Sequence, residues 1–287
     1  MKIVHLTAGT GSFLCGTCLR DNALVAELRA LGHEVRMVPL YLPHVVDEPS
    51  TTDAPVFFGG VNVYLQQKSA LFRRTPRAID ALLDAPFVLG FAGRRAGASR
   101  PEALGDLTLS MLEGERGHQK KELDRLARWL AEGPARGAAW VCLSNALLVG
   151  MARRIKEATG ARVACTFQGE DTFLDAMPEP FREASWRELG ARAAELDVIV
   201  AVSGYHAALM SRRLGLPEGR VRVVHNGIHT DGFVPAEEAP SPPVIGFLAR
   251  MFAGWSWMPS DSSSGYLPPQ MGGPIGDPGP GPVPPGP

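Results

Sequence analysis

Glycine and small polar residues follow the first apolar run of the sequence, at residues 7–16 (TAGTGSFLCG). Glycine lets backbone N–H groups approach a phosphate closely, and the N-terminus of a following helix favours an anion. Gly9 and Gly11 are therefore candidate phosphate-binding residues. The spacing does not match a dinucleotide fingerprint, because Leu14 occupies the third glycine position and no acidic residue ends the second strand. A tight strand-to-helix turn without a ligand explains the same pattern.

Two cysteines of this segment, Cys15 and Cys18, have the spacing of a redox pair or of half a zinc site. No second such pair follows at zinc-finger spacing, and Cys142 and Cys165 lie in apolar runs. We therefore expect thiols that pack or line a ligand loop, and no metal site. Four cysteines in 287 residues are also too few for a disulfide scaffold.

A later apolar run is followed by the polar residues 168–172 (QGEDT). Polar side chains at the carboxyl end of a buried strand are well placed to meet a ligand, which makes Gln168 and Glu170 candidate site residues. The same residues have a second interpretation, because Asp171 or Thr172 is suited to cap the next helix. Both interpretations are compatible with the sequence.

Two further features lie between residues 199 and 235. Ser203 ends an apolar run and is predicted to cap a helix that begins near Tyr205. The dipeptide Asn226–Gly227 predicts a turn with positive φ. Taken separately, neither feature indicates a particular chemistry.

These candidate residues lie on a pattern of short apolar runs that alternate with amphipathic segments of helical length. Runs of Val, Ile, Leu and Ala are typical of parallel strands covered on both faces, so we predict a doubly wound α/β sheet. A helix is predicted from about Arg20 to Leu31, and another over residues 115–132. The predicted strands are Lys2–Leu6, Glu34–Leu40, Val61–Leu65, Trp140–Leu143, Arg162–Phe167, Val198–Val202, Val221–His225 and Val244–Leu248.

The composition excludes several classes of protein. The formal net charge is −1, and no basic excess indicates a nucleic-acid partner. The N-terminal apolar run is shorter than a secretory signal requires, and no run approaches the roughly 20 apolar residues of a membrane helix. A cytoplasmic protein is therefore expected.

The region from Ile199 to Pro235 resembles one known family. An apolar strand ending in Val-Ser, a helix and the pattern V-x-V-V-x-N-G-I-x-x-x-x-F-x-P at residues 221–235 are similar to the junction region of GT-B glycosyltransferases of the glycogen-synthase-like group, called family four. The resemblance covers about residues 1–250. It implies that residues 1–235 form a Rossmann-like domain for a sugar or lipid-linked acceptor. A second domain would hold a nucleotide-diphosphate sugar.

The resemblance also assigns roles to particular residues. It places Gly9 and Gly11 beside the donor diphosphate or the acceptor, and it makes Ser203 and Asn226 candidate donor-binding residues. Gln168 occupies the place where many members carry a catalytic His, which leaves Glu170 as a substitute candidate. Arg250 matches the phosphate-binding Arg of the family.

The sequence departs from the family after Arg250. Residues 236–251 resemble a linker and the first strand of the donor domain, but the family's Lys and its pair of glutamates eight residues apart do not follow. Residues 251–287 contain no Lys or Arg and are rich in Gly and Pro, so we expect residues 252–287 to be a disordered tail. We hypothesise that a frameshift or a premature end replaced the donor domain.

The expected function is glycosyl transfer from a nucleotide sugar to an acceptor hydroxyl, without another cofactor. This chain alone is expected to be inactive because the donor half is incomplete. Contact with a membrane surface is one further expectation, and the sequence does not determine an oligomeric state. The alternatives are a non-catalytic acceptor-binding module and, less favoured, a Rossmann-type epimerase or reductase.

Overall fold

The computed structural model describes residues 1–9, 16–44, 50–52, 54–75, 101–227 and 234. The chain divides into two compact units, Met1–Asp231 and Gly232–Pro287, and almost all described residues belong to the first unit. The predicted strand Val244–Leu248 and the predicted tail lie outside the described residues.

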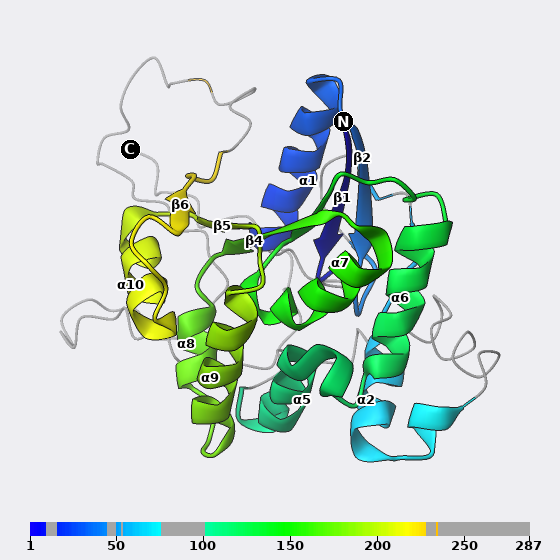
Figure 1. Cartoon of the computed structure of the whole chain (residues 1–287), viewed down its shortest axis with the longest axis vertical. Helices are drawn as coiled ribbons and strands as arrows, with labels where there is room; N and C mark the ends of the chain where they lie inside the picture. Colours follow the sequence, from blue (N-terminus) through cyan, green and yellow to red (C-terminus); the bar gives the residue numbers. More distant parts are fainter. Residues whose placement is uncertain (10–15, 45–49, 53, 76–100, 228–233, 235–287) are drawn as a thin grey trace, which may run out of the picture. The chain divides into compact units, whose positions relative to one another are not determined.

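The first unit is built on a six-stranded sheet in which every pairing is parallel, as Figure 1 shows. The strand order is β2-β1-β3-β4-β5-β6, so the chain reverses its direction of winding between β1 and β3. Sheets of this kind bind ligands at the carboxyl ends of the strands beside that reversal. The predicted α/β fold is confirmed. The strands are β1 (Lys2–Thr7), β2 (Glu34–Pro39), β3 (Trp140–Leu143), β4 (Arg162–Phe167), β5 (Val198–Ala201) and β6 (Val221–Val223).

Helices and short 3-10 turns connect the strands (Figure 1). The α-helices are α1 (Gly16–Ala30), α2 (Gly60–Lys68), α5 (Pro101–Glu113), α6 (Lys120–Glu132), α7 (Ala152–Thr159), α8 (Glu170–Asp175), α9 (Phe181–Ala193) and α10 (Gly204–Leu214). The 3-10 turns are η1 (Phe72–Arg74), η2 (Gly114–Arg116) and η3 (Ala146–Met151).

The two faces of the sheet are buried in separate clusters. Successive strand residues point to opposite faces, so Ile3 of β1 packs with Val25 of α1, whereas its neighbour Val4 belongs to the larger cluster on the other face. That larger cluster collects apolar residues of α6, η3, α7 and α9, including Leu126 and Leu189. Helix α1 thus covers one face of the sheet beside β1 and β2.

The structure corrects the prediction of a strand at Val61–Leu65, since these residues lie within α2. The short apolar run in the sequence suggested a strand, but the buried positions include Asn62 and Gln66, which are one helical turn apart. Both amides bond the Glu122 carboxylate of α6, with Nδ2–Oε1 and Nε2–Oε1 distances of 3.1 and 3.3 Å. Buried polar residues therefore help to place α2, together with the buried Val63.

Two predicted helices also differ in their limits. Helix α1 begins at Gly16, four residues before the expected start near Arg20. The single helix predicted over residues 115–132 is divided into η2 and α6, with Gly117 between them. A side chain at Gly117 would overlap the carbonyl of Ser110, so the chain leaves the helical path where α5 packs closely against it.

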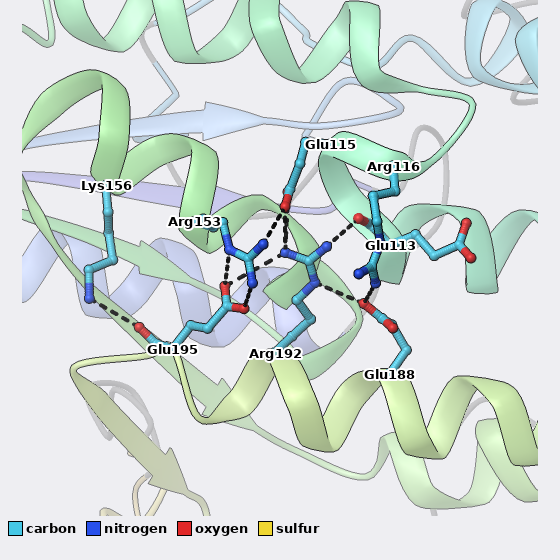
Figure 2. Close-up of polar contacts among 8 residues, drawn as sticks. All are labelled: Glu113, Glu115, Arg116, Arg153, Lys156, Glu188, Arg192 and Glu195. Atoms are coloured by element: carbon cyan, nitrogen blue, oxygen red, sulfur yellow. Dashed lines mark hydrogen bonds and ion pairs between the residues drawn. The ribbon is translucent and has the colours of Figure 1, made fainter.

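A network of charged residues joins α9 to η2 and α7, as Figure 2 shows. Arg192 of α9 is only 1% exposed, and its guanidinium lies 3.0 Å from Glu115 Oε1 and 2.9 Å from Glu188 Oε1. It also donates to the carbonyl of Glu113, while Arg153 at the start of α7 shares the Glu115 carboxylate at 3.0 Å. These contacts use one buried cation to hold three segments that are distant in sequence.

Replacement of Arg192 by Met should lower the free energy of unfolding by about 3 kcal/mol, because it removes the buried cation that pairs with Glu115 and Glu188 and donates to the Glu113 carbonyl. The matched control is Arg182→Met on the same helix, where Arg182 and Glu179 are 45% and 49% exposed. An exposed pair of this kind contributes less than about 1 kcal/mol. Urea unfolding measures both, and equal losses would show that the network does not stabilise α9.

Candidate functional site

The carboxyl edge of the sheet begins with a tight turn after β1. Gly9 has a φ of +68°, and a Cβ at this position would overlap the carbonyl oxygen of Leu42, which follows β2. The backbone N–H of Leu40 donates to the carbonyl of Thr7 at 2.7 Å, which draws the two strand ends together. Gly9 is therefore required by both its backbone conformation and its close packing. Gly11 lies outside the described residues.

Helix α1 brings a buried carboxylate under this turn. Asp21 accepts a hydrogen bond from Thr7 Oγ1 at 2.8 Å, and its Oδ1 lies 3.1 Å from His5 Nε2. Burial alone would lower the pKa of His5, but the Asp21 carboxylate outweighs it and raises the pKa to about 9. Arg20 also pairs with Asp21. The Asp21 carboxylate and its cationic partners His5 and Arg20 thus form a group of balanced charges next to the Gly9 turn.

The carbonyl oxygen of Ser144, directly after β3, links the ends of β3 and β4 to helix α1. It accepts from the Arg20 guanidinium at 3.1 Å and from Gln168 Nε2 at 2.6 Å. Gln168 Oε1 in turn lies 3.4 Å from Thr17 Oγ1 in the first turn of α1. The side chain of Gln168, predicted as a site residue, therefore spans the reversal point from β4 toward β1.

Glu170 holds the loop that follows β4. It is 7% exposed, and its carboxylate accepts from the backbone N–H groups of Ala146 at 2.8 Å, Gln168 at 2.8 Å and Gly169 at 3.0 Å. Burial by itself would raise the pKa of Glu170, but these donors and His206 outweigh burial and lower it. We call Arg20, Asp21, Ser144, Gln168 and Glu170 the carboxyl-edge cluster.

The loop after β5 meets this cluster through His206. Its Nε2 lies 3.6 Å from Glu170 Oε2, and its Nδ1 lies 3.7 Å from Asp171 Oδ1. Ser203 caps α10, as predicted, by accepting from the backbone N–H of His206 at 3.1 Å. The cap holds His206 in the first turn of α10, where its ring faces both carboxylates.

Two local predictions are wrong. Asp171 and Thr172 lie inside α8, whose N-cap is Gly169 without a side-chain cap bond. The Glu170 carboxylate accepts hydrogen bonds from the backbone N–H groups of Gln168 and Gly169. The first residue of α8 therefore bonds the backbone groups that directly precede the helix. Asn226 and Gly227 do not have positive φ, and Asn226 is exposed beyond β6.

The described thiols have packing environments. Cys18 is buried with its Sγ 4.0 Å from Thr7 Oγ1, and Cys165 Sγ donates to the carbonyl of Asn145 at 3.2 Å. Burial raises the pKa of Cys165 well above its ordinary value, so this thiol stays protonated near neutral pH. Cys15 and Arg250 lie outside the described residues.

A cavity of about 610 Å³ opens beside the carboxyl-edge cluster. Ala8, next to the Gly9 turn, and Asn145, next to Ser144, form one wall, and Phe173 of α8 forms another. Of the sixteen described lining residues, six are leucines and none is Asp, Glu, Lys, Arg or His. Helices α2 and α5 supply the remaining walls, including Val61 and Leu107.

The sequence patterns did not indicate Arg20, Asp21, Ser144 or His206 as site residues. The visible signal was a lone histidine, His5, within the apolar run of the first strand. A polar residue in a buried strand needs a partner, and Asp21 lies one segment later in the sequence. The contact of His206 with Glu170 joins positions 36 apart, so local patterns did not reveal it.

The sheet and the residues at its carboxyl edge define a parallel α/β domain in which polar groups lie where the strand order reverses. The sequence profile of Glycosyltransferase Family 4 matches residues 58–231, more than half of the chain. The chain belongs to this family. A search of curated proteins finds no match to the chain. Within the described ranges, no helix combines the length and apolar content that crossing a bilayer requires.

Replacement of Glu170 by Gln should lower the free energy of unfolding by about 2 kcal/mol at pH 7, because three backbone donors lose a charged acceptor. A carboxyl whose pKa is lowered on folding stabilises the protein above its ordinary pKa of 4.5. That contribution is lost as the pH falls through the lowered value. The difference between wild type and variant should therefore shrink at acidic pH.

Urea unfolding at pH 7, 5 and 3.5 measures this difference, with the exposed Glu218→Gln as the matched control. A difference that stays constant with pH would contradict an ionised acceptor at Glu170.

Proposed function

We propose that the described domain binds the acceptor in a glycosyl transfer that uses a nucleotide-sugar donor, within a two-domain GT-B enzyme. Family membership supports glycosyl transfer in general. The observation that carries the acceptor role is the carboxyl-edge cluster, because it gathers fixed polar groups beside a ligand-sized cavity at the reversal point.

In the proposed reaction, the acceptor hydroxyl oxygen forms a bond to the anomeric carbon of the donor sugar. The bond from that carbon to the diphosphate oxygen breaks, and the nucleoside diphosphate leaves with the electron pair. The hydroxyl proton passes to the leaving phosphate or to solvent. Fixed hydrogen-bond donors accelerate such a step by stabilising the charge that develops on the phosphate oxygens.

The two candidate catalytic residues receive different parts in this proposal. An amide is not a base at neutral pH, so Gln168 would orient the acceptor hydroxyl by a hydrogen bond. Glu170 would act as a positioning residue, because its carboxylate already holds the backbone of residues 168 and 169. A lowered pKa also makes Glu170 a poor proton acceptor.

The remaining candidates are proposed for the donor. Gly9 would line the donor diphosphate with its turn, and Ser203 and Asn226 follow β5 and β6 at the same edge of the sheet. Gly11 and Arg250, outside the described residues, are retained as candidate phosphate ligands on the family resemblance alone. A cytoplasmic location is part of the same proposal.

The second candidate function is an acceptor-binding module without turnover. The absence of Lys and Arg from residues 251–287 favours it, since cationic groups commonly neutralise a leaving diphosphate. We therefore expect slow turnover, or none, from this polypeptide alone.

The deciding experiment incubates the full chain, in excess, with radiolabelled uridine and guanosine diphosphate sugars and a panel of glycoside acceptors. Product that requires acceptor supports the transferase. Acceptor binding by calorimetry without product supports the binding module. Micromolar binding of NAD or NADP, with neither of these results, would overturn both and favour a reductase or epimerase.

Replacement of Gln168 by Met should weaken binding of the best acceptor about tenfold, because it removes the proposed hydrogen bond to the acceptor while keeping the side-chain volume. The matched control is Gln119→Met, which removes an equally bonded glutamine, 2% exposed, outside the site. Calorimetry measures acceptor affinity, and urea unfolding measures stability. Equal affinity losses in both variants would assign Gln168 a purely structural part.

A further inference from the structure

The side chains that line the cavity beside the carboxyl-edge cluster are suited to contact a hydrocarbon group of a ligand. Leucine, valine, methionine and phenylalanine dominate the lining, and none of its described residues carries a formal charge. A site for a phosphate or a free sugar would need charged or multiply polar side chains to replace the water that these ligands lose. The lining therefore favours an uncharged, apolar ligand moiety.

The few polar groups of the lining do not change this preference. Asn145 Oδ1 is already occupied, because it accepts from the backbone N–H of Leu147 at 3.0 Å. Burial raises the pKa of Tyr41, so its phenol stays neutral. Tyr64 is 54% exposed and suits the boundary between an apolar interior and water.

The position of the cavity connects it with the proposed reaction. Ala8 adjoins the Gly9 turn, and Asn145 adjoins Ser144, whose carbonyl accepts from Gln168. Phe173 belongs to α8, the helix that begins with Glu170. A ligand with its apolar part in the cavity would thus present its polar end to the carboxyl-edge cluster.

We infer that the cavity holds the alkyl chain of the acceptor, and that the acceptor is an amphiphile whose polar head carries the reacting hydroxyl. This inference rests on the proposed function for the reaction, but binding of the chain does not require turnover. The volume of about 610 Å³ lies in the range of cavities that enclose small organic ligands, roughly 300–1,000 Å³. Aliphatic side chains outnumber the three aromatic ones in the lining, which favours a flexible chain over a flat ring.

The test measures how affinity depends on chain length, without a donor. The full chain is titrated calorimetrically with butyl, hexyl and octyl β-glucosides below their micelle concentrations. Each buried methylene should tighten binding about threefold to fourfold. A glucoside carrying an oligo(ethylene glycol) chain as long as octyl should bind no better than the butyl compound.

Two variants test whether the dependence of affinity on chain length arises in the cavity. Leu107→Gln introduces a polar group on α5, and Val61→Trp fills the space from α2 with an apolar side chain. Both should reduce the octyl-to-butyl affinity ratio at least fivefold. The matched control Leu31→Gln makes the first change at a leucine that is 73% exposed outside the cavity, and its ratio should equal that of wild type. If Leu107→Gln fails to fold, Val61→Trp remains decisive.

The outcomes separate this inference from the proposed function. Affinity independent of chain length, unchanged ratios in both folded cavity variants, or tighter binding of phenyl than of octyl glucoside would each overturn the alkyl-chain site. Transfer to short sugar acceptors would leave the proposed function intact in that case. A chain-length dependence that the cavity variants abolish, in a protein that shows no glycosyl transfer with any donor, would support the site and favour the acceptor-binding module over turnover by this chain.

Discussion

The parallel pairing of all six strands is the constraint on which the rest of the domain depends. It brings every strand end to one edge, where the last backbone groups have no further partner in the sheet. Buried backbone groups must find other partners, and here side chains supply them. Arg20 and Gln168 donate to the Ser144 carbonyl, and the Glu170 carboxylate accepts from the Ala146 N–H, so the requirements of the fold themselves concentrate polar groups at the edge.

Compensation of charge makes this concentration tolerable within a folded protein. Asp21 is fully buried but faces His5, Arg20 and Thr7, and Glu170 receives three backbone donors and a nearby histidine. Away from the edge, Arg192 follows the same rule among its glutamates (Figure 2). Each of these buried charges is paired, and the pairing offsets the free-energy cost of removing a charge from water.

The polar carboxyl-edge cluster and the apolar cavity are separate but adjacent because different elements of the fold form them. The strand ends and α1 form the polar cluster, while α2, α5, α8 and the 3-10 turn η3 supply most of the apolar cavity. Ala8 and Asn145 belong to the cavity, and they adjoin the Gly9 turn and Ser144 of the cluster, respectively. An amphiphilic ligand matches this division better than a ligand of uniform polarity.

The sequence by itself determined most of the strands and their parallel arrangement, because runs such as residues 140–143 (WVCL) and 198–201 (VIVA) are apolar without interruption, a local property. It also indicated Gln168, Glu170, Gly9 and the Ser203 cap. Only the tertiary structure decided that Val61–Leu65 is helical, because the deciding contacts run from Asn62 and Gln66 to Glu122 on a distant helix. The same reason explains the carboxyl-edge cluster and the cavity: their members come from separate segments, and local patterns carry no information about which distant side chains complete a buried hydrogen bond or enclose a space.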